Sequence, residues 1–194
     1  MRWSMRKRKK ENKLQAVDSY FDTVEAGERR TLSDEKTKFF LRAKQAMQIV
    51  KVDQGIVKDA GIPGENQIRK CDYLCKNDAH KQVHLIELKG EVIKDAFLQL
   101  ENTPNAIKEK SAYGSLLDGL SRMDAYVVSP QKQRVPADID EAKWRLCRKM
   151  ASYSKERLEN IFELLKLVKV GAKIKVLVEK DGVIWCSNEC PLEF

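Results

Sequence analysis

The sequence predicts an α/β fold in which helices flank a central mixed β-sheet and a β-hairpin follows near the C-terminus. Residues 70–75 and 82–90 are two β-like runs separated by a short polar loop. A segment with helical spacing follows at 92–101, and another strand-like run at 124–129. A strand, a helix and a strand in succession indicate a right-handed parallel crossover.

The length, 194 residues, is enough for one well-buried domain. We assign residues 1–30 to a basic N-terminal arm with a helical lead-in, and residues 31–194 to a single domain. Within this domain we expect a core over 33–130, followed by a C-terminal helix and the hairpin over 138–190.

The chain is basic, with 37 Lys and Arg residues against 29 Asp and Glu residues and a formal net charge of +8. This excess favours polyanions as partners. Six of the first ten residues are Lys or Arg, and Trp3 lies among them, so the arm can neutralise phosphates while Trp3 stacks on a base. A disordered, solvated terminus explains the arm at least as well, because blocks of like charge are usually solvated.

The chain shows no apolar run long enough to cross a membrane. The longest candidate, at 161–170, is interrupted by charges, and the basic N-terminus lacks the apolar stretch of a signal peptide. We expect a soluble, cytoplasmic protein with no membrane partner.

Ahead of the two β-like runs, the pattern favours a helix with Ser33 as its N-cap. Apolar residues then recur at helical spacing, at Phe39, Phe40, Ala43, Met47 and Val50. We expect this stripe to cover the sheet, and Gly61 to Gly64 to break the chain before the next strand.

The C-terminal third is expected to begin with a charged helix over 138–168. Its partial apolar face contains Trp144, Leu146, Met150, Leu158, Ile161, Leu164 and Leu165, and we expect this face to pack on the rest of the domain. Residues 172–179 and 183–185 then predict the hairpin, with Asp181-Gly182 as its turn.

The two β-like runs bring acidic residues together. Alternate residues of a strand share a face, so Glu87 and Lys89 point one way and His84 the other. If the runs pair symmetrically across their loop, Asp72 lies opposite Glu87, with Cβ atoms roughly 5 Å apart. Two carboxylates at that distance repel, so such a site either raises a pKa or binds a cation.

Two other Glu-x-Lys triplets occur, at Glu11 to Lys13 and Glu141 to Lys143, so the triplet alone is not specific. Both lie in polar, helix-like sequence, whereas Glu87-Leu88-Lys89 lies in an apolar run downstream of an Asp-bearing strand. An exposed strand with an ordinary ion pair between Glu87 and Lys89 is the alternative.

Asp72, a loop, Ile86-Glu87-Leu88-Lys89-Gly90 and a following helix together resemble the PD-(D/E)XK nuclease superfamily, over about residues 68–105. The resemblance implies a restriction-endonuclease-like αβββαβ core. It also implies that Asp72, Glu87 and the carbonyl of Leu88 hold Mg²⁺, or Mn²⁺, and that Lys89 positions or activates the attacking water. Cys71 stands where the family name has Pro.

The resemblance points to two further residues. Glu35 is the best candidate for the glutamate that the family often carries on its first helix. Gln99 resembles a glutamine that some branches place near the substrate or the metal-bound water, and we assign it to nucleic-acid binding. A glutamine on the helix surface is about equally plausible. The family's first strand is expected within 48–60.

Five cysteines and two histidines raise the question of another metal site. Cys71 and Cys75 are four strand steps apart, about 13 Å, which is too far for one tetrahedral zinc ion. They face away from Asp72 and Glu87 in the predicted strand. Buried, reduced thiols are therefore expected, and two histidines leave little room for histidine-centred catalysis.

These observations predict a metal-dependent nuclease that hydrolyses phosphodiester bonds, with DNA favoured and RNA not excluded. The resemblance implies a role in restriction, repair or defence. The small size suggests that a homo-oligomer or a protein partner supplies specificity. The alternative is a catalytically inactive nucleic-acid-binding or scaffold protein with the same fold.

Overall fold

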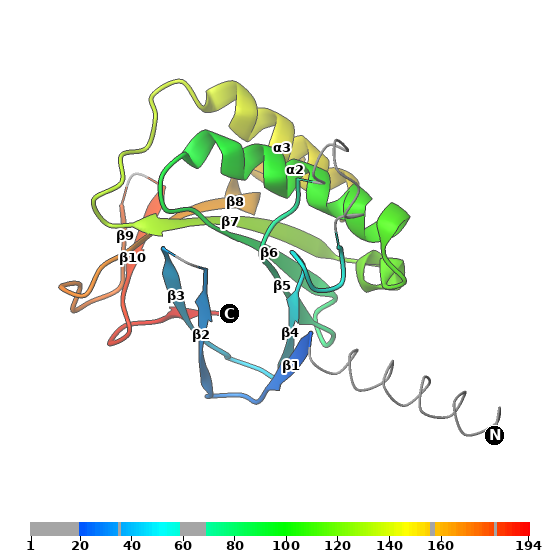
Figure 1. Cartoon of the computed structure of the whole chain (residues 1–194), viewed down its shortest axis with the longest axis horizontal. Coiled ribbons are helices and arrows are strands. Elements are labelled where there is room, and N and C mark those ends of the chain that lie inside the picture. Colours follow the sequence, from blue (N-terminus) through cyan, green and yellow to red (C-terminus); the bar gives the residue numbers. More distant parts are fainter. Residues whose placement is uncertain (1–19, 35, 59–68, 156–157, 181) are drawn as a thin grey trace, which may run out of the picture.

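The structure is a computed structural model, and it describes residues 20–34, 36–58, 69–155, 158–180 and 182–194. Eight of the described strands form one mixed sheet (Figure 1). In order across the sheet they are β1 (Phe21–Val24), β4 (Met47–Lys51), β5 (Tyr73–Asn77), β6 (Gln82–Leu88), β7 (Arg122–Pro130), β8 (Leu165–Val170), β10 (Val183–Cys186) and β9 (Val178–Lys180). The predicted α/β class with a mixed sheet is thus confirmed.

Strand direction changes once along the middle of the sheet. From β1 to β6 the neighbouring strands are antiparallel, whereas β6, β7, β8 and β10 are parallel to one another. The helix α2 (Ile93–Lys110) connects β6 to β7, so the predicted strand, helix and parallel strand are confirmed. Residues spaced three or four apart on α2 are buried against the sheet: Ile93, Ala96, Phe97 and Leu100.

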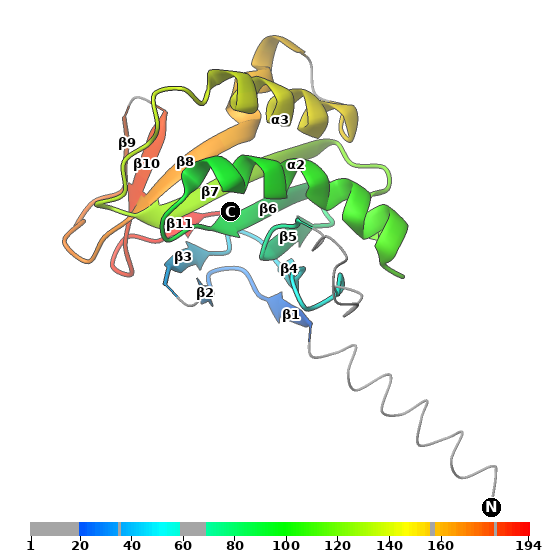
Figure 2. The ribbon, with the colours of Figure 1, turned by 45° about the horizontal axis from the view of Figure 1, so that its top comes forward.

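The two faces of the sheet are covered differently. Helices α2 and α3 (Asp140–Ser152) lie side by side over one face, as Figure 2 shows from a second direction. A three-stranded sheet of β2 (Arg29–Ser33), β3 (Lys38–Arg42) and β11 (Leu192–Glu193) covers the other. In the described part of the chain, the helices expected to flank the sheet therefore cover one face only.

The helix expected after Ser33 is wrong as well. Ser33 ends β2, and the following residues form β3 and β4. Phe39 and Leu41 are fully buried on the inner side of β3, and Met47 and Ile49 on β4 join the same core. These positions fit a period of two as well as a helical one. Strand β3 forms where it can cover the open face of the large sheet, and β4 forms by pairing with β1 and β5 inside that sheet.

Residues 21–30 belong to the fold rather than to an N-terminal arm. Strand β1 pairs with β4, with Val24 opposite Met47 and fully buried, and β2 pairs with β3. The boundary predicted after residue 30 is therefore wrong for this segment. The basic residues of the arm, Trp3, Glu35 and the break at 61–64 lie outside the described residues.

The predicted C-terminal helix is too long. Helix α3 ends at Ser152, a 3₁₀ segment η2 covers Leu158–Leu164, and β8 follows, with Leu165 and Leu167 buried against the helices. Leu165 and Leu167 therefore share one face of a strand that runs parallel to β7, whereas the prediction had placed them on one face of a helix. Another 3₁₀ turn, η1 (Gly114–Leu117), precedes β7.

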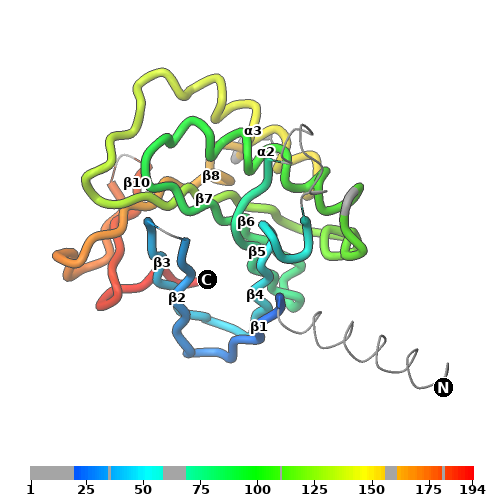
Figure 3. The backbone as a smooth tube through the Cα atoms, in the orientation of Figure 1, coloured from blue at the N-terminus to red at the C-terminus, as the bar shows by residue number. Residues whose placement is uncertain are grey.

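The C-terminal hairpin is confirmed, although β9 is only three residues long. Strands β9 and β10 are antiparallel, and Gly182 adopts a positive φ of 71° beside Asp181, which lies outside the described residues. In Figure 3 the chain end returns beneath the large sheet, where β11 pairs with β3. Among the described residues, no helix is long and apolar enough to span a membrane.

Candidate metal and phosphate site

The register of the β5–β6 hairpin is the one predicted. Leu74 lies opposite Leu85 and Tyr73 opposite Ile86, so the same register continued by one step sets Asp72 opposite Glu87. Asp72 itself precedes the strand by one residue. Its Oδ2 accepts a hydrogen bond of 2.7 Å from the backbone N–H of Leu88, so the carboxylate is held across the end of the hairpin.

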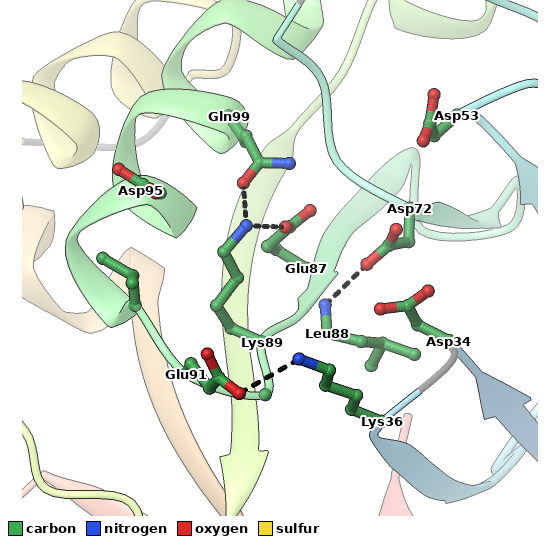
Figure 4. A pocket seen from close by; sticks show the side chains of 12 residues that line it. Asp34, Lys36, Asp53, Asp72, Glu87, Leu88, Lys89, Glu91, Asp95 and Gln99 are labelled. Carbon is green, nitrogen blue, oxygen red and sulfur yellow. Dashed lines mark hydrogen bonds and ion pairs between the residues drawn. The ribbon is translucent and has the colours of Figure 1, made fainter.

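Asp72, Glu87 and Lys89 line an open pocket of about 360 Å³ at the end of β6 (Figure 4). The remaining lining residues are Asp34, Lys36, Asp53, Leu88, Gly90, Glu91, Val92, Asp95 and Gln99. The lining thus contains six carboxylates and two lysines. An anionic substrate would be repelled from this pocket unless cations bind there.

Lys89 is held between the strand and the helix. Its Nζ lies 3.2 Å from Oε1 of Glu87 and also donates a hydrogen bond to Oε1 of Gln99 (Figure 4). The Nε2 of Gln99 donates to the backbone carbonyl of Lys70 at 3.2 Å. Gln99 therefore faces the pocket and positions Lys89, and its assignment to nucleic-acid binding stays a prediction.

A buried threonine anchors this part of α2 to the hairpin. The hydroxyl of Thr103 donates to the carbonyl of Gln99 and accepts from the N–H of Cys71, both at 2.7 Å. Thr103 is fully buried, so both bonds are formed away from water and fix the distance between the helix and the hairpin.

Glu87 is the most unusual group of the site. Its side chain is 2% exposed, and its Oε2 has no hydrogen-bond partner among the described residues. Burial, and secondly the charge of Asp72, raise the pKa of Glu87 to about 9. Without a cation this carboxyl group therefore holds a proton at neutral pH.

The pKa of Asp72 is also raised, to about 6, chiefly by burial. The N–H of Leu88 opposes this shift, whereas the charges of Asp34 and Asp53 add to it. Two neighbouring carboxylates with raised pKa values are a pair that a divalent cation would stabilise in ionised form.

The residues present fit the predicted ligand set of two carboxylates and one carbonyl. Among the described residues, no three His, Cys, Asp or Glu side chains are grouped closely enough to hold one metal ion. The predicted set does not require a third side chain, because its third ligand is the backbone carbonyl of Leu88, which is one of the lining residues. Oxygen-only ligation of this kind suits Mg²⁺ or Mn²⁺.

The sequence alone did not point to four of the six carboxylates of the pocket, Asp34, Asp53, Glu91 and Asp95. Asp34 directly follows β2, in a segment that was predicted to be helical. Glu35, the candidate for the glutamate of the first helix, lies outside the described residues. Asp53 lies beyond β4 and pairs at 2.9 Å with Lys70, whose side chain is only 3% exposed. The turn signal at Gly55 was the one sequence clue to Asp53.

The loop after Lys89 contacts the small sheet. Lys36 forms an ion pair of 3.0 Å with Glu91 across the pocket mouth, and a Cβ added at Gly90 would lie 3.0 Å from the Cβ of Lys36. A side chain at position 90 would press on Lys36, which explains why a glycine suits this position.

The cysteines do not gather into a metal site. Cys75 packs in the core facing the small sheet, whereas Cys71 packs on the helix side, where Glu87 also lies. The prediction that both face away from the site is therefore wrong for Cys71, because the chain bends at Asp72. All five cysteines are free, and burial raises the pKa of Cys75 to about 12.

His84 lies on the opposite face of β6, as predicted. Its Nδ1 is 3.3 Å from Oδ2 of Asp124, and its ring packs against Tyr126 and Phe194. It belongs to the core beneath the sheet rather than to the pocket.

No family model, curated protein or solved structure matches this chain.

Proposed function

We propose that this protein is a metal-dependent phosphodiesterase that acts on nucleic acid, with DNA as the favoured substrate. The observation that carries the proposal is Glu87, a buried carboxylate with one unpartnered oxygen, next to Asp72 and Lys89 in an open pocket. A buried carboxylate oxygen without a partner is costly, and a bound cation would offset that cost.

Asp72, Glu87 and the carbonyl of Leu88 would hold the ion. Bound there, Mg²⁺ would neutralise phosphate charge and lower the pKa of its water. With a cation in place, the surplus of carboxylates in the pocket no longer excludes a phosphodiester.

Lys89 would stabilise the attacking hydroxide or transfer its proton. The amide of Gln99 holds the Lys89 ammonium at the pocket side of Glu87, so the charge is oriented before a substrate arrives. The hydrogen bond from Leu88 to Asp72 leaves the second oxygen of Asp72 for the ion.

The strand order supports the resemblance to PD-(D/E)XK nucleases. Strands β4, β5 and β6, helix α2 and strand β7 are consecutive along the chain and adjacent in the sheet, which agrees with the βββαβ part of the restriction-endonuclease-like core. The restriction, repair or defence role and a partner that supplies specificity belong to the same proposal.

The Glu-x-Lys triplet on α3, Glu141 to Lys143, offers a matched control for the test. We expect Lys89→Ala to lower Mg²⁺- or Mn²⁺-dependent cleavage of plasmid, linear and single-stranded DNA by at least 10²-fold, and Lys143→Ala to leave it unchanged. RNA is tested in parallel. If wild type and Lys89→Ala behave identically on every substrate, the enzyme proposal fails and the inactive nucleic-acid-binding protein remains.

A further inference from the structure

The two faces of the small sheet of β2, β3 and β11 carry different side chains. The inner face is apolar, with Leu32, Phe39, Leu41 and Leu192 buried in the core beneath the large sheet. Alternate positions of the strands form the outer face, which points away from that core. They are Arg29, Thr31 and Ser33 on β2, Lys38, Phe40 and Arg42 on β3, and Glu193 on β11, and all except the half-buried Phe40 are exposed. The outer face therefore carries more cations than carboxylates.

Two arginines of the outer face lie directly opposite each other. Arg29 on β2 pairs in register with Arg42 on β3, and like charges at such positions repel. Glu193 on β11 offsets only part of this charge, because it is shared between Arg42 at 4.0 Å and Lys44 at 3.6 Å. No described carboxylate pairs with Arg29, whose guanidinium donates to the backbone carbonyl of Asn188 at 3.3 Å. An anion bound between the arginines would relieve their repulsion.

A hollow of about 420 Å³ adjoins this pair of arginines. Its charged lining consists of Arg29, Arg42, Lys44, Glu189 and Glu193. Glu189 is already paired with Lys175, whose Nζ lies 2.7 and 2.8 Å from its two carboxylate oxygens. The hollow therefore keeps an excess of positive charge, which favours an anionic occupant.

The opposite end of the outer face lies at the pocket of Glu87. Ser33 and Lys38 pair in register at this end, and Asp34 and Lys36, from the connection between β2 and β3, both line the pocket (Figure 4). The four strand steps from Lys38 to Arg42 span roughly 13 Å. That length equals the rise of about four nucleotides along one strand of a duplex. One backbone can therefore reach both the pocket and the paired arginines.

We propose that the outer face of the small sheet binds the sugar-phosphate backbone of the nucleic acid whose phosphodiester enters the pocket. Arg29, Lys38 and Arg42 contact phosphates that flank the reacting one, and the hydroxyls of Thr31 and Ser33 add hydrogen bonds. Arginine, lysine and hydroxyl groups are the side chains that commonly bind phosphate oxygens. This inference rests on the proposed function, because that function supplies the nucleic acid that crosses the outer face.

The composition of the outer face favours a nucleic acid over a protein partner. The centre of a protein interface is depleted in charge and enriched in aromatic side chains, but no large apolar side chain of the outer face is exposed. Trp144, which was expected on the buried face of its helix, is exposed beside Phe162 on the other side of the large sheet (Figure 2). Leu177 lines the hollow without belonging to the outer face.

The test is fluorescence anisotropy of a labelled DNA duplex with the full chain in EDTA, where metal-dependent cleavage cannot occur. We expect Arg29→Ala combined with Arg42→Ala to weaken binding by about tenfold or more. The slope of log K against log salt should fall by about 2, because each phosphate contact contributes about 0.9. The matched control combines Arg145→Ala with Arg148→Ala, which removes the same charge from α3, and it should bind within about twofold of wild type.

A pair of charge-retaining substitutions separates electrostatics from packing. Arg29→Lys combined with Arg42→Lys should keep most of the affinity and the salt slope of wild type. The inference is overturned if wild type does not bind the duplex, or if the two alanine pairs weaken binding equally. Cleavage in Mg²⁺ tests the proposed hydrolysis separately. Binding that follows the expected pattern without any cleavage would support this surface and refute the hydrolysis.

Discussion

The same three-residue pattern occurs in two described parts of this chain with different outcomes. Glu87 and Lys89 lie on β6, where residues two apart share a face, and their charged groups meet at 3.2 Å. Glu141 and Lys143 lie on α3, where residues two apart point in different directions, and Lys143 instead lies 4.0 Å from the exposed Asp140. The backbone decides whether the pattern forms a pair at all.

Burial adds a second difference. Glu87 is enclosed, with an unpartnered oxygen and a pKa raised to about 9 by burial, whereas Glu141 is exposed to solvent. An exposed carboxylate is already satisfied by water, but a buried one requires a proton or a cation. The environment of the triplet, and not the triplet itself, therefore creates a site.

The largest expected effect is on cation binding. Glu87→Gln removes one of two carboxylate ligands, so we expect the affinity for Mn²⁺, measured by isothermal titration calorimetry, to fall by about 100-fold or more. Glu141→Gln should bind Mn²⁺ as wild type does. An unchanged affinity of Glu87→Gln would show that the ion binds elsewhere.

A smaller effect is expected at Gln99, which orients Lys89. Gln99→Ala leaves the ammonium with Glu87 as its remaining described acceptor, and we expect kcat to fall by about tenfold with KM little changed. Gln99→Glu keeps an acceptor for Lys89 and should restore part of the rate. A rise in KM with kcat unchanged would assign Gln99 to substrate binding instead.

Measurements of stability test the hydrogen bonds through which Thr103 anchors α2 to the hairpin. Thr103→Val keeps the shape but leaves the N–H of Cys71 without its acceptor, and we expect a loss of about 1–3 kcal/mol in the free energy of unfolding. Ser152→Ala, at the exposed end of α3 where the hydroxyl bonds to Lys149, should cost less than about 0.5 kcal/mol. Urea denaturation monitored by circular dichroism measures both.

The stability of the folded protein is expected to depend on pH through Glu87 but not through Glu141. In EDTA, folded Glu87 keeps its proton up to about pH 9, whereas the unfolded chain releases it near pH 4.5. The folded state then binds more protons between these values, so the free energy of unfolding falls as pH rises across the window. Asp72 adds the same trend between pH 3.8 and about 6.

We therefore expect the Tm of wild type in EDTA to fall by a few degrees more than that of Glu87→Gln between pH 5 and 9. Glu141→Gln should follow wild type, and Mg²⁺ should raise the Tm more at pH 8 than at pH 5. Parallel Tm curves for wild type and Glu87→Gln would show that Glu87 is ionised in the folded protein.

The local sequence pattern was sufficient to predict the β5–β6 hairpin, α2 and the C-terminal hairpin. The loop between the two β-like runs set the pairing of Leu74 with Leu85, and hence the approach of Asp72 to Glu87. The helical spacing after Gly90 identified α2, and the Asp-Gly pair identified the C-terminal hairpin. In each case the interaction joins residues close in sequence, so periodicity and turn chemistry suffice.

Elements that depend on distant partners could not be predicted in this way. The residues from Phe39 to Val50 satisfy a helical and a strand period. Only distant partners select the strands, because β3 packs on the open face of the large sheet and β4 pairs with β5 inside it. The same ambiguity affected β8, which pairs in parallel with β7. Tertiary packing overrides local propensity when a pattern fits both periods.

By itself, the sequence determined the hairpin, its register and the alternation that sets Glu87 and Lys89 on one face, because these depend on neighbours along the chain. Only the tertiary structure decided that Asp34 and Asp53 join the pocket, that Gln99 holds Lys89, and that Glu87 is buried. The physical reason is that burial and charge are properties of all the groups surrounding an atom, and most of those groups come from other parts of the chain.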